Sequence, residues 1–479
     1  MTSAESSTED PPAAPTGPQI VARLDRLPRS AVAYAATGIV GLGLFVIFYC
    51  NFDINVSFIQ TCAQIQPGCT PANAQSWLTL PVCVYLAGYL VGGLVIAPMS
   101  DRFGRRGVLA FTLCFALVGS LITAIALNYP IFVIGRAITG IAMGGTLAIG
   151  NTYIGELAPA TARARYTAIS FVLCTIGAMA GIGFGLLFTT EAAPFPTGLP
   201  FALGFADGWR WIYAFAAAVG LVAVLITVRL PESPRWLVSH GRIADADRVV
   251  TAIEARVRQP LPEPGPALPL PVTTATGRAY RELFADPRYL RRTLLLIAMW
   301  FTGYATVFSY STGSTVVLTG LHFTAPVAGM ISAVGGVGFF VQGLFSARWS
   351  EVLERRYWLP IGAALTVLGA IVIATLGSSI GWAFAGSFLV FFGFNVWVPP
   401  TFALSAESFP TRVRSAGFGL VDGIGVLGGA MGVLVIAPLV PRLAPLPALL
   451  VISGFLVVSA VLAQFTPRTR NRALEEVSP

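Results

Sequence analysis

Charge is scarce in this chain, lysine is missing altogether, and only two histidines are present. Charged residues make up 11% of the 479 positions, whereas soluble domains carry about 25%. Apolar residues make up 55%, and the mean hydropathy is +0.75. This composition excludes an ordinary water-soluble domain. Because His240 and His322 accompany no cluster of metal-ligating or nucleophilic side chains, we also expect no enzymatic activity, no metal and no cofactor.

The absence of lysine means that all 30 basic residues are arginine, a bias that a GC-rich bacterial genome explains. The resulting pI near 9.4 is high enough to suggest a nucleic-acid partner. The arginines, however, stand in short segments between apolar runs, where basic residues set membrane topology. We therefore expect a lipid bilayer around the chain and no nucleic acid.

Twelve runs are long and apolar enough to cross a membrane, which requires about 20 residues each. The predicted fold is an all-α membrane protein with twelve transmembrane helices in two pseudo-symmetric six-helix bundles, residues 31–230 and 291–466. We expect a disordered tail over 1–30, a linker with short amphipathic helices over 231–290, and a second tail over 467–479. The expected spans are 31–58, 77–99, 107–127, 131–154, 166–189, 210–230, 291–319, 325–347, 357–376, 380–404, 415–440 and 445–466.

The arginines are distributed unevenly over the two sides of this topology. All but Arg136, Arg210 and Arg442 fall in the tails, in the linker or in loops on the side of the N-terminus. Since cytoplasmic loops carry the excess of arginine, both termini are predicted to be cytoplasmic, in a multi-pass protein of the cell membrane.

One pattern occurs twice, about 250 residues apart. The pattern Glu156, Pro159, Arg163 recurs with the same spacing as Glu407, Pro410, Arg414. A duplicated helical bundle is a hallmark of secondary transporters, whose substrate path lies between the repeats. The repeat therefore predicts a carrier of a small molecule, which we expect to act as a monomer.

Four motifs occur in a fixed order between the spans. They are Asp-Arg-Phe-Gly-Arg-Arg at 101–106, Gly-Arg at 135–136, the Glu…Pro…Arg pattern at 156–163, and Pro-Glu-Ser-Pro-Arg-Trp-Leu at 231–237. Together they resemble the major facilitator superfamily, most closely its sugar-porter and metabolite–proton symporter branches, over about residues 31–466. The resemblance implies alternating access between two bundles.

The resemblance also implies a cytoplasmic gate of charged residues at the inner helix ends. An alternative is that these charges anchor helix ends at the membrane surface. The second copy of the first motif, 347–356, is degraded, so we expect a weaker gate in the C-terminal half. The expected gate residues are Asp101, Arg102, Arg105, Glu156, Arg163, Glu232, Arg235, Glu407 and Arg414.

Acidic and basic residues inside the spans are costly and mark functional sites. Asp53 stands where the resemblance implies a proton-coupling carboxylate, paired with Arg136 of the fourth span. The alternative is a permanent structural ion pair. For Asp422, in the eleventh span, we expect pairing with the inner arginine cluster, with a second proton or cation site as the alternative.

Sugar porters carry amide side chains where this chain has Phe171, Met299, Trp300 and Ala305. The predicted cavity is therefore mostly aromatic, and with Arg136 as a cation it favours an organic or aromatic acid. A sugar or polyol is the alternative. The expected substrate-binding residues are Tyr49, Asn51, Phe171, Thr175, Trp300, Tyr304, Tyr310, Asn395, Trp397 and Phe402.

Import by proton symport is the favoured mode of transport. Proton-antiport export and a non-transporting membrane sensor are the alternatives; the segment 231–237 disfavours the former and the short tails disfavour the latter. Cys62 and Cys69 flank a short polar loop and form either a disulfide or two free thiols.

Overall fold

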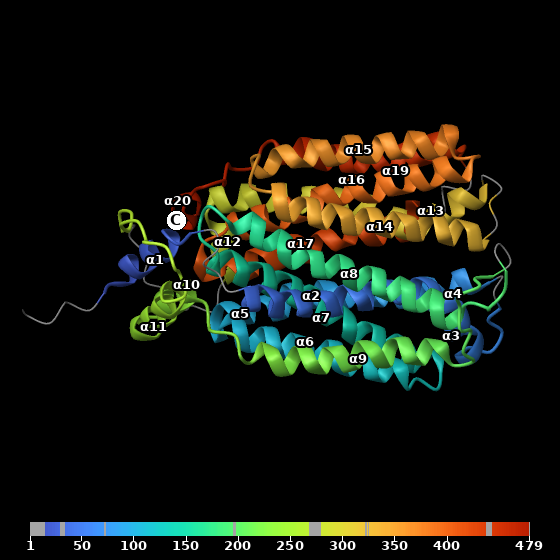
Figure 1. Cartoon of the computed structure of the whole chain (residues 1–479), viewed down its shortest axis with the longest axis horizontal. Coiled ribbons are helices and arrows are strands. Elements are labelled where there is room, and N and C mark those ends of the chain that lie inside the picture. The colour runs from blue at the N-terminus through green and yellow to red at the C-terminus, as the bar shows by residue number, and fades with distance from the viewer. Residues whose placement is uncertain are drawn as a thin grey trace, which may run out of the picture.

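The computed structural model describes residues 15–28, 34–70, 73–194, 198–267, 279–320, 323, 325–436 and 443–478. Within these ranges the regular structure is helical, and twelve helical segments are long and apolar enough to span a membrane. The prediction of an all-α membrane protein with twelve spans is confirmed. Figure 1 shows the long helices running side by side along one axis.

The first six spans form the N bundle, drawn in blue to green in Figure 1. Two of them are irregular: the first divides into two helices at Asp53, whose backbone stays in the helical region, and the second contains a π-helical turn. The spans are α2 (Tyr34–Phe52) with α3 (Ile54–Ile65), α4 (Ala74–Val91) with η1 (Gly92–Ile96) and α5 (Ala97–Phe103), α6 (Arg105–Ala124), α7 (Tyr129–Leu157), α8 (Arg163–Thr189) and α9 (Gly208–Thr227).

The last six spans form the C bundle, drawn in yellow to red. Its helix α14 packs along α8 of the N bundle, while α17 packs against α4, η1, α5 and α7. The spans are α13 (Pro287–Gly320), α14 (Ala325–Trp349), α15 (Arg355–Leu376), α16 (Ile380–Glu407), η2 (Thr411–Val413) with α17 (Arg414–Met431) and η3 (Gly432–Ile436), and α19 (Pro445–Ala463).

Glycines bring α4 and α7 into backbone contact. A Cβ on Gly88 would lie 2.2 Å from the carbonyl oxygen of Ala137, and one on Gly144 would lie 2.0 Å from that of Tyr89. Small residues permit such approach where lipid supplies no hydrophobic drive between helices. The contact fixes Tyr85 and Tyr89 of α4 beside α7, which matters for both acidic sites described below.

One end of the molecule carries short helices outside the spans, and we call it the linker end (left in Figure 1). These helices are α1 (Gly17–Asp25), α10 (Pro234–Ser239), α11 (Ile243–Glu254), α12 (Ala279–Ala285) and α20 (Leu474–Val477). At the opposite end Cys62 and Cys69 form a disulfide, which decides between the two alternatives for this pair.

The expectation of a disordered tail was wrong for residues 15–28, because α1 lies there. Ile20 and Leu24 are spaced for one helix face and are fully buried. On the other side Arg23 binds Glu254 and Asp247 of α11, both at 2.5 Å. Residues 1–14 and 29–30 of the expected tail, and Arg442 and His322, lie outside the described residues.

Candidate functional site

Asp53 and Arg136 form a buried ion pair inside the N bundle. The guanidinium donates from Nη1 to Asp53 Oδ1 at 2.9 Å and from Nη2 to the carbonyl of Cys50 at 2.8 Å. It also lies over the ring of Tyr85, 4.8 Å from the centroid. Asp53 is 0% exposed, and its Oδ2 has no hydrogen-bond partner among the described residues. The pair therefore joins α2 and α3 to α7 and leaves one carboxylate oxygen open.

Aromatic side chains from both bundles meet at the centre of the molecule. The ring of Phe171 on α8 lies 5.8 Å from Phe339 on α14 and 5.7 Å from Phe402 on α16. Phe402 stacks on Trp300 of α13 at 5.4 Å, and Trp300 contacts Trp397 at 5.1 Å. Because these rings touch across the bundle interface, a substrate that binds here must displace them.

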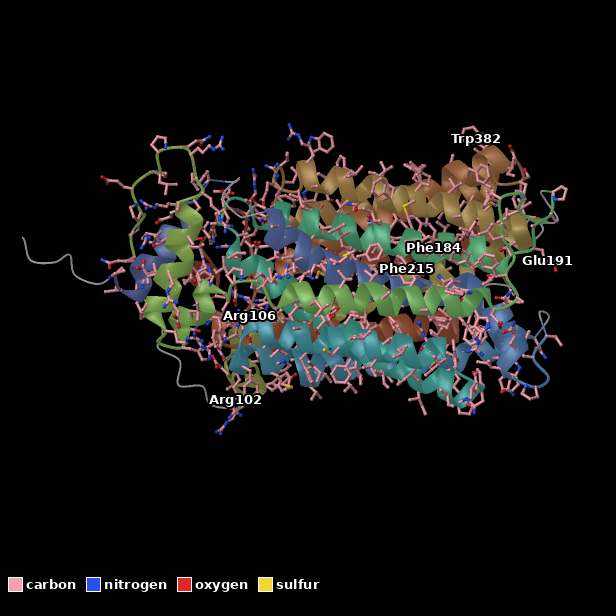
Figure 2. The ribbon with its side chains drawn as sticks, turned by 60° about the horizontal axis from the view of Figure 1, so that its bottom comes forward. Arg102, Arg106, Phe184, Glu191, Phe215 and Trp382 are labelled. Atoms are coloured by element: carbon pink, nitrogen blue, oxygen red, sulfur yellow. A yellow bond between two sulfur atoms is a disulfide. The ribbon has the colours of Figure 1, made fainter. Side chains whose placement is uncertain are left out.

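Two of the expected lining residues point away from this centre. The hydroxyl of Tyr49 donates to the carbonyl of Ile212 on α9 at 3.0 Å, and its ring packs on Phe184 and Phe215 inside the N bundle. Figure 2 shows Phe184 and Phe215 next to each other. Tyr310 pairs with Ser453 at 2.7 Å inside the C bundle. The hydroxyls of Tyr49 and Tyr310 thus bond within their own bundles, and the substrate-binding role that we predicted for them stays a prediction.

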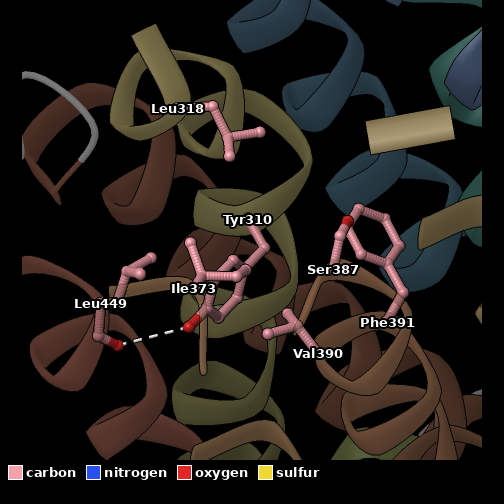
Figure 3. Close-up of a pocket in the computed structure, with 7 residues that line it drawn as sticks. All are labelled: Tyr310, Leu318, Ile373, Ser387, Val390, Phe391 and Leu449. Atoms are coloured by element: carbon pink, nitrogen blue, oxygen red, sulfur yellow. Dashed lines mark hydrogen bonds between the residues drawn. The ribbon is translucent and has the colours of Figure 1, made fainter. Parts of the chain in front are cut away.

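Tyr310 instead lines a small pocket within the C bundle (Figure 3). The pocket has room for about one water molecule. Of the other lining candidates, Asn51 is half-buried on α2, and Thr175 lies beside Gly343 of α14, with its hydroxyl donating to the carbonyl of Val172.

An amide pair supplies polar atoms near the aromatic centre. Asn395 Nδ2 donates to the carbonyl of Phe339 at 2.9 Å and to Gln342 Oε1 at 2.7 Å. Asn395 is fully buried, and its Oδ1 has no partner among the described residues. Sequence reasoning missed Gln342, although a glutamine in an otherwise apolar span is itself a signal.

Four predicted gate residues form one buried network at the linker end. Arg105 binds Asp101 and Glu156, each at 2.8 Å, and Arg414 of the C bundle binds the same Glu156 oxygen at 3.1 Å. Arg105 also donates to the carbonyl of Thr411, across the interface, at 2.9 Å. Asp101, Arg105, Glu156 and Arg414 thus hold the two bundles together at this end.

Each bundle also caps a helix of the other. Asp101 accepts hydrogen bonds from the backbone N–H groups of Ser415 and Ala416 at the start of α17. In the repeat-related position, Glu351 accepts from the N–H of Arg165 at the start of α8, at 3.1 Å. A carboxylate at a helix N-terminus is favourable because it meets unpaired N–H groups and the positive end of the dipole. Glu351 was missing from our predicted gate because its motif is degraded.

The remaining predicted gate residues have other partners. Glu232 accepts from the N–H of Arg105 at 2.9 Å and so caps α6. Glu407 contacts Arg355 within the C bundle at 3.4 Å. Arg102 is exposed, lies over the ring of Phe103, and points away from the molecule (Figure 2). It does not join the buried network in the described part of the chain, and its gate role stays a prediction.

Arg163 and Arg235 bind segments outside the spans. Both contact Asp25 at the end of α1, at 3.2 and 2.7 Å. Arg235 also binds Glu475 of α20, while Arg163 donates to the carbonyl of Arg472. These arginines therefore tie α1, α10 and α20 together at the linker end.

Asp422 does not pair with the inner arginine cluster, so that prediction was wrong. Its carboxylate accepts from the hydroxyl of Tyr304 at 2.7 Å and from that of Tyr89 at 2.9 Å. Arg414 stands eight residues earlier on the same helix, about 12 Å along the axis, and turns to Glu156 instead.

Comparisons with known proteins agree with this architecture. The glucose transporter GlcP of Staphylococcus epidermidis is 27% identical over 413 residues, covering 82% of this chain and 86% of that protein. The niacin transporter NiaP of Acinetobacter baylyi is 24% identical over 424 residues, covering 87% and 89%. A structure of the proton:xylose symporter XylE superposes with a TM-score of 0.74 at 20% identity, covering 94% and 99%.

The family profile described as "Sugar (and other) transporter" matches residues 35–479, nearly the whole chain. Together with the twelve spans and the two-bundle fold, this match settles the family. The chain belongs to the sugar transporter family of the major facilitator superfamily, and it is a multi-pass membrane transporter.

Proposed function

We propose that this protein is a proton-coupled symporter of a small metabolite, working by alternating access, with the linker end in the cytoplasm. The buried pair of Asp53 and Arg136 is the observation that carries the proposal. A buried carboxylate that has one arginine partner and one open oxygen can exchange a proton with a large effect on its attraction to that partner.

The pair couples protonation to helix movement. Protonation of Asp53 removes its charge, which weakens the bond to Arg136 and frees the break between α2 and α3 from α7. Arg136 keeps its contacts to the Cys50 carbonyl and the Tyr85 ring, so its charge is not left bare. Deprotonation restores the ion pair. In this way a proton gradient drives the same rearrangement that carries substrate.

The gate supplies the second half of the cycle. Access from the linker end requires Arg414 to leave Glu156 and α17 to leave Asp101. Both interactions run between the bundles, so they break when the bundles rock apart. The arginine-rich loops lie at this same end, which supports its assignment to the cytoplasm.

For the substrate we propose a sugar or a polyol. Both Nη atoms of Arg136 already donate to Asp53 and to the carbonyl of Cys50, and the guanidinium is buried against the ring of Tyr85, so it offers little to a substrate anion. The Oδ1 of buried Asn395, which has no partner among the described residues, can accept a hydrogen bond from a substrate hydroxyl, and the amide of Gln342 lies beside it. Aromatic rings such as Trp300 and Phe402 can pack on the face of a sugar. Relatives named as glucose and D-xylose transporters support the same class.

An organic or aromatic acid is the second candidate. The stacked rings of Phe171, Phe402 and Trp300 favour a flat apolar substrate, and one relative is named a niacin transporter. This candidate requires a cation for the carboxylate, so binding would compete with Asp53 for Arg136.

The test is uptake into proteoliposomes of sugars, polyols and aromatic acids, with and without an inward proton gradient. We expect a sugar or polyol to accumulate with the gradient. Asp53→Asn should abolish accumulation while sparing exchange of substrate across the membrane. Accumulation that ignores the gradient, or full accumulation by the variant, would refute proton coupling through Asp53; accumulation of aromatic acids alone would refute the substrate class.

A further inference from the structure

Asp422 lies in a polar cluster that spans the bundle interface. It stands about half-way along the span Thr411–Val435 and is 0% exposed. Tyr304 of α13 donates to its Oδ1 at 2.7 Å, and Tyr89 of α4 lies 2.9 Å from Oδ2 and 3.0 Å from Oδ1. The two phenol oxygens are themselves 2.9 Å apart. The cluster therefore joins a carboxyl group of the C bundle to a hydroxyl group of the N bundle.

The number of hydrogens in the cluster depends on the charge of Asp422. Four oxygen–oxygen contacts of hydrogen-bond length join the three groups in three pairs, because Tyr89 lies within reach of both carboxyl oxygens. The two phenols supply only two hydrogens for these three pairs, so with an ionised carboxylate one of the pairs has no hydrogen. With a proton on Oδ2, the groups close a ring in which Asp422 donates to Tyr89, Tyr89 to Tyr304, and Tyr304 to Asp422. The geometry suits three hydrogens.

The neighbouring charges do not neutralise Asp422. Among the described residues, its hydrogen-bond partners are the two tyrosines. The buried and half-buried charged groups on the elements packed against α17 are engaged elsewhere. These are Asp101 of α5 and Glu156 of α7 with Arg105, Arg136 of α7 with Asp53, Glu407 of α16 with Arg355, Glu282 of α12 with Arg412, and Arg292 of α13 with the carbonyls of Ser408 and Val477. Arg102 of α5, Arg281 of α12, and Arg288 and Arg291 of α13 are exposed. A bare buried carboxylate would pay a large desolvation cost.

We propose that Asp422 is a second proton-binding site, which holds its proton while the linker end is closed and releases it when that end opens. When α4 moves away from α17, Tyr89 leaves the ring and water reaches the carboxyl group. The O–H bond of the acid then breaks, and the proton passes to that water. This inference rests on the alternating-access cycle proposed above, but it concerns a different residue in the other bundle.

The protonation state can be measured directly by infrared difference spectroscopy of the full chain in lipid, titrated from pH 5 to pH 9. We expect wild type at pH 7 to show a protonated carboxylic C=O band that Asp422→Asn lacks. Asp53→Asn, which alters the other buried acid, should keep this band. If Asp422→Asn removes an ionised carboxylate band instead, Asp422 holds no proton and the proposal fails.

Matched tyrosine variants test the ring. Tyr304→Phe removes the donor to Oδ1, so the acid C=O band should shift to higher frequency. Tyr85→Phe removes a hydroxyl one turn before Tyr89 on the same helix, with no bond to Asp422, and should leave the band in place. An identical spectrum for Tyr304→Phe and wild type would contradict the ring.

Amide exchange tests the coupling to conformation. If the protonated acid favours the closed linker end, raising the pH should speed exchange at Ser415 and Ala416 by more than the intrinsic chemical rate. Asp422→Asn is permanently neutral and should remove the part of this excess that Asp422 contributes. Asp53→Asn should keep that part, and the double variant with both substitutions should show no excess. An equal excess in Asp422→Asn and wild type, or none in wild type, would overturn the coupling.

The proposal for Asp422 and the proposed function can be refuted by different results. An ionised Asp422 would remove this one and leave proton coupling through Asp53 untouched. Uptake without proton dependence would remove the proposed function and leave the infrared result standing.

Discussion

Asp101 Oδ2 accepts a hydrogen bond of 2.8 Å from the backbone N–H of Ala416, so a carboxylate of the N bundle caps a helix of the C bundle. Glu351 caps α8 in the opposite direction through the N–H of Arg165. The closed linker end is therefore held by reciprocal helix caps as well as by ion pairs. Helix caps of this kind are each worth about 1 kcal/mol.

Loss of one cap should loosen the closed state. We predict that Asp101→Asn, which keeps the shape but removes the charge, speeds amide exchange at Ser415 and Ala416 roughly fivefold, the equivalent of about 1 kcal/mol. Hydrogen–deuterium exchange with mass spectrometry measures this. Arg102→Gln, at the exposed neighbouring position, is the control and should exchange like wild type. Equal rates in both variants would contradict the cap.

Amide contacts to substrate can be tested at Asn395. Under the proposed sugar or polyol class, Asn395→Ala should raise the KM for uptake roughly two- to tenfold, as expected for one lost hydrogen bond of about 0.5–1.5 kcal/mol. Tyr310→Phe, whose hydroxyl lies inside the C bundle, should leave KM unchanged. A normal KM for Asn395→Ala would place the substrate elsewhere.

The close contact of α4 and α7 makes a prediction about stability. Gly144→Ala places a Cβ 2.0 Å from the carbonyl oxygen of Tyr89, so the helices must separate. We expect a loss of about 1–3 kcal/mol, measured as a lower thermal unfolding midpoint in detergent. Gly454→Ala on α19, where nothing lies within 4 Å, should not lower the midpoint. Similar losses for the two variants would argue against the contact.

The contact of α20 with Arg235 should weaken only at strongly acidic pH. Burial of Glu475 opposes its ionisation, but the charge of and hydrogen bond from Arg235 outweigh it and lower the pKa of Glu475 from 4.5 to about 2. A depressed carboxyl pKa gives stability that is complete above the unfolded pKa of 4.5 and is lost as the pH falls through about 2. Protease protection of residues 467–478 should therefore persist from pH 7 down to pH 5.

Substitution tests the same contact at neutral pH. Glu475→Gln should expose this segment to protease at pH 7, because the partner charge of Arg235 is lost. Glu476→Gln, at the exposed neighbouring position, should not. Protection that survives in Glu475→Gln would show that Leu474 and Val477, both buried, suffice to hold α20.

The sequence was informative about spans because apolar length and arginine position report directly on the bilayer. The pair of Asp53 and Arg136 was predicted from the resemblance of their segments to those of a transporter family, and the cost of a lone charge inside an apolar run is consistent with it. Helix rotation was not predictable. Tyr49 and Tyr310 stand on lining helices but face their own bundles, and Asp422 lies two turns too deep to reach the arginines.

Two further features were not predicted, because the sequence was judged by the composition or motif of a whole segment and not by single residues. Residues 15–28 sit in a polar, Pro-containing stretch, so the apolar face formed by Ile20 and Leu24 escaped notice. Glu351 escaped because its motif lost Arg and Phe, although the carboxylate alone does the capping.

A single guanidinium, that of Arg235, holds both Asp25 and Glu475, residues 450 positions apart in the sequence. Deletion of the segment that carries Asp25 or of the one that carries Glu475 would leave the buried charge of Arg235 with one carboxylate partner in place of two. A fusion tag or truncation that displaces one of these segments therefore changes the contacts of the other. Kinetic comparisons of variants of this carrier should use chains with identical termini.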